Sequence, residues 1–215
     1  MRGRETGVIA WEGAHDGREA YRGTVAVATA HDGGRERTSA PDATLDDSTR
    51  ARTSKGTAAM RIAVGSDHAG FHLKEHVKAV LAALGHEVVD VGPVTSGSVD
   101  YPQFAADAAR LVGAGEVDRG VLACGSGVGV AIVANKVAGV RAVNAHDPAE
   151  AEMARRHNDA NVVTLSGSRL GPREADTIVT AFLRTEFEGG RHARRVGQIV
   201  ALESASKEPD TALLS

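Results

Sequence analysis

The chain has 215 residues, of which 42% are hydrophobic and 3% aromatic, and its 25 basic and 28 acidic residues leave a net charge of −3. This length fits one domain with an appendage. The charge balance argues against nucleic-acid binding, and no apolar run reaches the ~18 residues that a membrane span needs. The single cysteine excludes an internal disulfide framework and favours a reducing, cytoplasmic location.

The first 59 residues differ in composition from the rest of the chain. They mix Gly, Arg, Asp, Ser and Thr without a sustained helical or strand period. Residues 24–30 have the composition of a short strand, but no partner segment is evident nearby. We therefore expect residues 1–59 to be a disordered or non-native extension, with Met60 as the natural start. The expected folded domain covers 60–205, and 206–215 form a flexible tail.

From Met60 onward, short apolar runs alternate with segments of helical period. Strands that alternate with helices imply right-handed crossovers and a three-layer, doubly wound (Rossmann-like) α/β fold around a five-stranded parallel sheet. The scarcity of aromatic residues leaves Val, Ala, Leu and Ile to fill the core, as suits a buried parallel sheet. The expected strands are 61–65, 87–91, 120–123, 140–145 and 161–165. The expected helices are 71–84, 103–112, 128–136, 148–157, 172–187 and 191–203.

Five such strands favour the order 2-1-3-4-5, although the pattern does not fix it. In that order the winding direction reverses between the first and third strands, and ligands bind beyond the carboxyl ends of the strands at such a point. The first strand ends in SDHAG (66–70) and the third in CGSGVG (124–129). We expect these two loops to meet at one crevice.

The loop after the third strand places three glycines directly behind the only cysteine, Cys124. Gly125, Gly127 and Gly129 allow successive amides to point at one anion or developing oxyanion, and the same field favours the thiolate. A dinucleotide-binding loop is the rival interpretation. However, Val130 stands where the third fingerprint glycine belongs, and the loop follows the third strand instead of the first. A buried, inert cysteine is the structural alternative.

Several histidines accompany the first of these loops. Asp67 and His68 are either caps of the following helix or site residues. His68, His72 and His76 recur every four residues and so resemble a ligand row. No Glu base and no third ligand accompany them in the pattern of zinc helices, so we predict no metal and assign His72 and His76 to a solvated face.

Positive charge gathers in the last third of the chain. Arg191 and Arg195 are four residues apart and share one helical face, with His192 beside them, and Arg169 lies in GSRLG. Such a run can be a solvated face. A guanidinium pair at a helix start also suits a phosphate group.

Six motifs together resemble those of type B ribose-5-phosphate isomerase, in the same order over residues 60–203. Besides the two loops, they are DYP (100–102), ANKVAGVRA (134–142), HNDANV (157–162) and GGRHARRV (189–196). The wider family includes allose-, galactose- and tetrulose-phosphate isomerases, so the resemblance specifies the fold better than the sugar.

The resemblance implies an aldose–ketose isomerase that interconverts ribose 5-phosphate and ribulose 5-phosphate through a cis-enediolate, with no metal and no cofactor. Cys124 is the implied base between C1 and C2, and Ser126 supplies a hydroxyl that assists it. The amides of Gly125 to Gly129 hold the enediolate. One branch of the family uses a Glu just after this loop, where Val130 cannot take a proton, so the chain belongs to the cysteine branch.

The same resemblance assigns the other site residues and the assembly. His157 with Asp67 opens the furanose ring. The implied phosphate ligands are His68, Arg169, Arg191 and Arg195, and Tyr101 and Asn158 line the sugar. Homodimers or homotetramers are implied, with sites completed by a neighbour.

The alternatives are an isomerase of tetrulose 4-phosphate, allose 6-phosphate or galactose 6-phosphate, a non-catalytic nucleotide-binding module, and a cysteine hydrolase, for which His157 has no obvious acidic partner.

Overall fold

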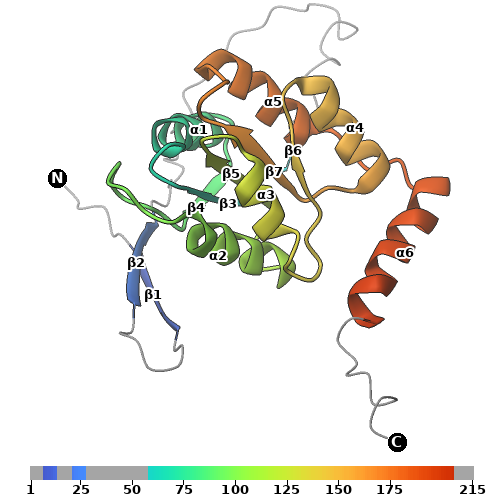
Figure 1. The fold of residues 1–215 in the computed structure, drawn as a ribbon, viewed down its shortest axis with the longest axis horizontal. Helices are drawn as coiled ribbons and strands as arrows, with labels where there is room; N and C mark the ends of the chain where they lie inside the picture. Colours follow the sequence, from blue (N-terminus) through green and yellow to red (C-terminus); the bar gives the residue numbers. More distant parts are fainter. Residues whose placement is uncertain (1–6, 14–20, 28–57, 206–215) are drawn as a thin grey trace, which may run out of the picture. The chain divides into compact units, whose positions relative to one another are not determined.

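The computed structural model describes residues 7–13, 21–27 and 58–205, and it divides the chain into two units between Gly56 and Thr57. In the first unit, β1 (Gly7–Gly13) pairs with β2 (Tyr21–Val27) in an antiparallel ladder (Figure 1). The strand expected over 24–30 overlaps β2, and its partner β1 is the segment that the sequence reading missed. Residues 1–6, 14–20 and 28–57 of the extension and the expected tail at 206–215 lie outside the described residues.

The second unit contains the expected parallel sheet of five strands (Figure 1). The strands lie in the spatial order β4-β3-β5-β7-β6, and the Rossmann-like α/β fold is confirmed. Most predicted bounds agree to within one or two residues. The strands are β3 (Arg61–Ser66), β4 (Glu87–Asp90), β5 (Arg119–Cys124), β6 (Ala142–Asn144) and β7 (Val162–Ser166).

The expected order 2-1-3-4-5 is wrong at one edge of the sheet, because the order found is 2-1-3-5-4. All five residues of β7 are buried, whereas the three residues of β6 are partly exposed. A parallel strand covered on both faces belongs inside the sheet, and a short strand suits an edge. The reversal between β3 and β5 is unaffected, since β3 pairs with β4 on one side and β5 on the other.

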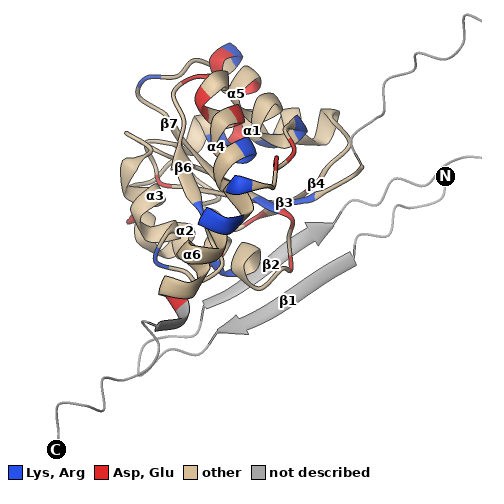
Figure 2. Cartoon of the chain, turned by 90° about the vertical axis from the view of Figure 1, so that its right-hand side faces the viewer, with Lys and Arg blue, Asp and Glu red and all other residues tan. Residues whose placement is uncertain are grey.

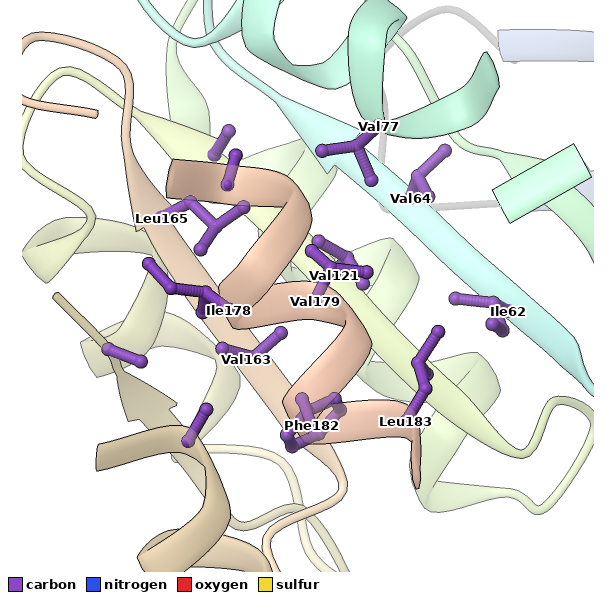
Figure 3. Packing of buried hydrophobic residues seen from close by; sticks show 14 of the residues in the cluster. Ile62, Val64, Val77, Val121, Val163, Leu165, Ile178, Val179, Phe182 and Leu183 are labelled. Atoms are coloured by element: carbon purple, nitrogen blue, oxygen red, sulfur yellow. The ribbon is translucent and has the colours of Figure 1, made fainter. Parts of the chain in front are cut away.

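Helices cover both faces of the sheet and form the outer layers. One apolar cluster joins the strands to α1 (Phe71–Ala83), α4 (Pro148–Asn158) and α5 (Pro172–Arg184). The other joins them to α2 (Tyr101–Gly113) and α3 (Val128–Ala134). Figure 3 shows how α5 packs against the first face, with Ile178, Val179, Phe182 and Leu183 over the side chains of the strands.

The last helix, α6 (Arg191–Ala205), stands apart from these layers and contacts α4 (Figure 1). The Gly139 amide donates to Oε2 of Glu203 at 2.9 Å, which ties the helix to the loop before β6. A cavity of about 480 Å³ lies between α6 and this part of the molecule, lined among others by Arg141, Asn158 and Ile199. Among the described residues, no helix has the length and apolar character needed to cross a membrane.

Candidate active site

Three loops meet at the carboxyl ends of β3, β5 and β7. The Asp67 amide donates to the Ala123 carbonyl at 3.2 Å, so the first loop lies directly on the end of β5. A Cβ atom on Gly70 would come within 2.5 Å of the Ala123 carbonyl oxygen, and one on Gly167 within 2.6 Å of the Ala69 carbonyl oxygen. Glycine is required where backbones approach this closely. The predicted meeting of the SDHAG and CGSGVG loops is therefore confirmed.

Cys124 is the last residue of β5, and only 4% of its surface is exposed. The Gly127 amide donates to its Sγ atom at 3.1 Å. Gly127 has a φ of 78°, in the left-handed region that favours glycine, and it starts the turn into α3. The Val128 amide donates to Oγ of Ser126 at 3.2 Å, which leaves the hydroxyl proton of Ser126 available to a ligand.

The carbonyl groups of this loop point to the other side, toward β6 and β7. The Ser166 hydroxyl donates to the Gly125 carbonyl, and the Thr164 hydroxyl donates to the Gly127 carbonyl, each at 2.8 Å. The side-chain amide of Asn144 donates to the Ser126 carbonyl at 3.3 Å. Asn144, Thr164 and Ser166 were not among the site residues predicted from the sequence. No local motif signals them, because each contacts the loop across the sheet.

The loop after β3 contains two predicted site residues, Asp67 and His68. Oδ1 of Asp67 accepts the Gly70 amide at 2.7 Å, so Asp67 shapes the turn before α1 as the structural interpretation held. His68 is exposed, with Nδ1 3.3 Å from the Val99 carbonyl oxygen.

Two further predicted residues, Tyr101 and Arg169, lie at the same group of loops. The Tyr101 ring covers the start of α3 so closely that a Cβ atom on Gly129 would meet its Cζ atom at 2.7 Å. Arg169 is exposed in the loop after β7, and its amide donates to the Ser166 carbonyl at 3.3 Å.

The other predicted residues lie on the opposite side of the sheet, at the amino ends of the strands. His157 and Asn158 end α4, and Arg191 and Arg195 begin α6. The chain leaving α4 pairs at Asn161 with the backbone that precedes β6, which is the amino end of the strands. A strand rises ~3.3 Å per residue. The four steps from Gly120 to Cys124 alone therefore separate the amino and carboxyl ends of the strands by about 13 Å. One chain does not bring His157 and Cys124 together.

His157 belongs to a compact cluster with Glu188 and His192. The His157 and His192 rings stack with centroids 4.3 Å apart and planes 7° from parallel. Oε2 of Glu188 lies 3.9 Å from Nε2 of His157 and 3.8 Å from Nε2 of His192. Burial, followed by the charges of His157 and Arg191, lowers the pKa of His192.

Glu188 is thus the acidic partner of His157 that sequence reasoning did not find. The spacing of Glu188 and His192, four residues apart, was the available signal, but the two glycines between them break any helical reading. Figure 2 shows basic residues at the start of α6, and of these Arg191 contacts His192 of the cluster.

This cluster is the single group in the described parts of the chain whose ligand atoms lie close enough to hold a metal ion, within 4.8 Å of one another. Its geometry does not fit one. A metal lies in the plane of each imidazole that binds it, at ~2.0–2.1 Å for zinc, and two stacked, nearly parallel rings do not share such a point. The Nε–H of Arg191 also donates to Nε2 of His192 at 3.3 Å. In the row of His68, His72 and His76, for which we predicted no metal, Nε2 of His76 lies 2.6 Å from Oδ1 of Asp176.

The family model for ribose/galactose isomerases matches residues 62–199, which is more than half of the chain. The fold, the glycine loop behind a cysteine and this match define the class: the chain belongs to the ribose/galactose isomerase family, whose members are sugar-phosphate isomerases. The resemblance to type B ribose-5-phosphate isomerase is also confirmed. The Escherichia coli ribose-5-phosphate isomerase B is 47% identical over 143 residues, covering 66% of this chain and 96% of the relative.

Two further relatives bear on the substrate. A D-erythrulose-4-phosphate isomerase of Pectobacterium atrosepticum is 39% identical over 149 residues, covering 69% of this chain and 98% of the relative. The solved structure of ribose-5-phosphate isomerase B from Mycoplasma genitalium with bound ribulose 5-phosphate is 41% identical, with a TM-score of 0.65. The match covers 67% of this chain and 96% of that chain.

Proposed function

We propose that this protein interconverts ribose 5-phosphate and ribulose 5-phosphate. The observation that carries the proposal is the buried thiol of Cys124, held 3.1 Å from the amide nitrogen of Gly127 where the loops of β3, β5 and β7 meet. The ribose-5-phosphate isomerases among the relatives support the five-carbon sugar.

The proposed chemistry moves one proton between neighbouring carbons. The Cys124 thiolate takes the proton from the carbon next to the carbonyl and returns it to the former carbonyl carbon, so the C1–C2 unit passes through a cis-enediolate. The hydroxyl proton of the first carbon passes to the former carbonyl oxygen, which completes the exchange of carbonyl and hydroxyl. The amides of Gly125 to Gly129 and the hydroxyl of Ser126 hold the developing oxyanion. Donors that are already aimed at the charge need no reorganisation when it forms.

The residues proposed for ring opening and phosphate binding come from both the carboxyl and the amino ends of the strands. We assign ring opening to His157 with Asp67, and contacts to the sugar to Tyr101 and Asn158. The proposed phosphate ligands are His68, Arg169, Arg191 and Arg195.

The loops around Cys124 and the His157 cluster lie at opposite ends of the strands. We therefore propose that a second copy of the chain supplies the cluster, in a homodimer or a pair of dimers. Val128 and Ile132 support this proposal, because these apolar side chains are 49% and 56% exposed on α3 beside the crevice.

The substrate is tested by one coupled assay that compares ribose 5-phosphate, allose 6-phosphate, galactose 6-phosphate and erythrulose 4-phosphate. We expect the highest kcat/KM with ribose 5-phosphate and no loss of activity after treatment with a chelator. A higher kcat/KM for erythrulose 4-phosphate would assign the chain to the activity named for its Pectobacterium relative. No turnover of any of these sugars, together with saturable binding of NAD, would instead support a nucleotide-binding module.

A further inference from the structure

Three consecutive carbonyl groups of the glycine loop each accept a hydrogen bond from a side chain of β6 or β7. The Gly125 carbonyl accepts from Ser166, the Ser126 carbonyl from Asn144 and the Gly127 carbonyl from Thr164, at 2.8, 3.3 and 2.8 Å. Thr164 and Ser166 are fully buried two residues apart on one face of β7. Asn144 pairs in register with Thr164. These donors form a row along the side of the loop that faces β6 and β7.

This row determines where the amides of the loop point. In a trans peptide the carbonyl and the following N–H lie in one plane and point in opposite directions. A carbonyl held toward β7 or β6 therefore aims the next N–H toward the crevice. Two of these amides have partners there: the Gly127 amide donates to Sγ of Cys124 at 3.1 Å, and the Val128 amide donates to Oγ of Ser126 at 3.2 Å.

We propose that Asn144, Thr164 and Ser166 are positioning residues that fix the amides around Cys124 and Ser126. Glycine peptides are the most flexible in a chain, so a loop with three glycines does not by itself keep its amides aimed at one point. Hydrogen bonds to these carbonyls restrict the alternative orientations before a ligand arrives. The strand order is what makes this possible, because β7 pairs directly with β5 and sets Ser166 opposite Cys124.

The catalytic part of this inference rests on the proposed isomerase function and is tested by kinetics. Thr164→Val and Ser166→Ala keep the buried shape but remove one donor each. We expect kcat to fall roughly tenfold to a hundredfold with KM little changed, because the amides act on charge that develops in the transition state. Thr164→Ser should restore most of the activity. Thr177→Val is the matched control, since it also removes a hydroxyl that donates to a carbonyl at 2.8 Å, but on the exposed face of α5.

The second test needs no substrate and so separates this inference from the proposed function. Cys124 is the only cysteine, so iodoacetamide reports on it alone. The alkylation rate at neutral pH divided by the rate in alkaline buffer measures the thiolate fraction and cancels changes in access. We expect Asn144→Ala to lower this ratio several-fold, because the Gly127 amide loses its fixed direction toward Sγ. Thr177→Val should leave the ratio unchanged.

The outcomes of the two tests are distinct. A lowered ratio in Asn144→Ala, together with a wild type that turns over no sugar phosphate, would leave the positioning role in place and refute the proposed function. Wild-type kcat and a wild-type alkylation ratio in all three variants, with normal thermal unfolding, would overturn the positioning role whether or not the protein is an isomerase. A loss of kcat that Thr164→Ser does not restore would also count against it.

Discussion

At the residue scale, the proposed mechanism depends first on the thiol of Cys124. A carbon-bound proton next to a carbonyl is weakly acidic, so the base must touch C1 or C2 while donors hold the oxygen. We expect Cys124→Ala to lower kcat by ~10²–10⁴-fold, which is the usual contribution of a general base, and to retain substrate binding. Cys124→Ser should recover little, because a hydroxyl is a poor base at neutral pH. The coupled isomerase assay and a separate binding titration measure the two effects.

Isotope labelling gives an independent check on the same step. In deuterated water the wild-type product should gain deuterium at the transferred position, since the thiol exchanges its proton with solvent between removal and return. Near-normal turnover by Cys124→Ala, or an unlabelled product, would show that the thiol does not carry the proton.

His157 and Glu188 give the second prediction at this scale. If His157 opens the furanose ring, His157→Asn should reduce turnover of ribose 5-phosphate far more than that of erythrose 4-phosphate, which cannot form that ring. Glu188→Gln should give the same pattern to a smaller degree, because Oε2 of Glu188 lies 3.9 Å from Nε2 of His157 and helps to hold that ring in place. Glu186→Gln is the control, since Glu186 is exposed two residues away. Equal losses with both sugars would assign His157 another role.

The residues of the site that could be predicted are those whose chemistry is written into a contiguous motif. Cys124 and its glycines stand together at a strand end, and the structure places them at the reversal point as expected. Glu188, Asn144 and Thr164 were missed because each acts on a residue at least 18 positions away or across glycines that hide the relation. Such partners become visible only when the register of the sheet is known.

At the element scale, the end of α4 is held by a charge network that explains much of the HNDANV motif. Asp159 ends the helix with a φ of 47° and accepts from Arg155 at 2.8 Å and from Arg141 at 2.9 Å. Arg155 is only 2% exposed and also donates to the Ala160 carbonyl at 2.6 Å. The motif therefore contains structural residues that fix the turn on which His157 is presented.

This network predicts a large effect on stability from one exchange. Asp159→Ala leaves the buried guanidinium of Arg155 without its carboxylate, so we expect the free energy of unfolding to fall by about 2–3 kcal/mol. Glu152→Ala on the same helix removes an exposed ion pair of 3.6 Å with Arg156 and should cost less than ~0.5 kcal/mol. Denaturant unfolding measures both values, and a similar small loss in the two variants would contradict the structural role of Asp159.

The join between α1 and β4 carries a pH dependence. His86 is buried there, and its Nδ1 accepts the Met60 amide at 3.2 Å. Burial lowers the pKa of His86 below its ordinary value of 6.5, because the charged form is disfavoured in the folded state. The unfolded chain then binds more protons than the folded chain as the pH falls below 6.5, so this contribution to stability is present above that pH and is lost beneath it.

His86→Asn tests that dependence, since its side-chain carbonyl can accept the Met60 amide without titrating. We expect the wild type to lose more stability than the variant between neutral pH and pH 5, as measured by the denaturant midpoint. The comparison isolates His86, because His192, whose pKa is also lowered, is present in both proteins. Parallel pH profiles for the two proteins would show that His86 does not contribute.

The elements themselves could be predicted better than their arrangement. Apolar periodicity located all five strands of the sheet and all six helices of the described second unit. It could not order β6 and β7, because the order depends on how well each strand is covered, and coverage is a property of the folded layers. The five-residue strand β7, with every residue buried, lies inside the sheet, and the three-residue strand β6 lies at its edge.

At the scale of the whole molecule, the position of α6 matters most. The helix carries Arg191 and Arg195 and contacts α4 outside the three layers (Figure 1). Its basic start adjoins His157 at the amino ends of the strands, whereas Cys124 lies at their carboxyl ends. A substrate of five carbons does not reach from one end of the strands to the other within one chain. A symmetric dimer, in which each copy presents its His157 cluster to the other's crevice, resolves this separation with two identical contacts.

Such a dimer predicts complementation between two inactive variants. Each mixed dimer of Cys124→Ala and His157→Asn contains one site with both residues intact and one site with neither. Random mixing makes half of the dimers mixed, so the mixture should regain about one quarter of wild-type activity on ribose 5-phosphate. Co-expression of the two variants, or mixing under conditions that exchange subunits, provides the sample. Cys124→Ala with Ser126→Ala is the control, because both changes lie in the crevice and every site of the mixed dimer keeps one defect. If the first pair regains no more activity than the control pair, each chain completes its own site, and the proposed sharing of His157 across a dimer is wrong.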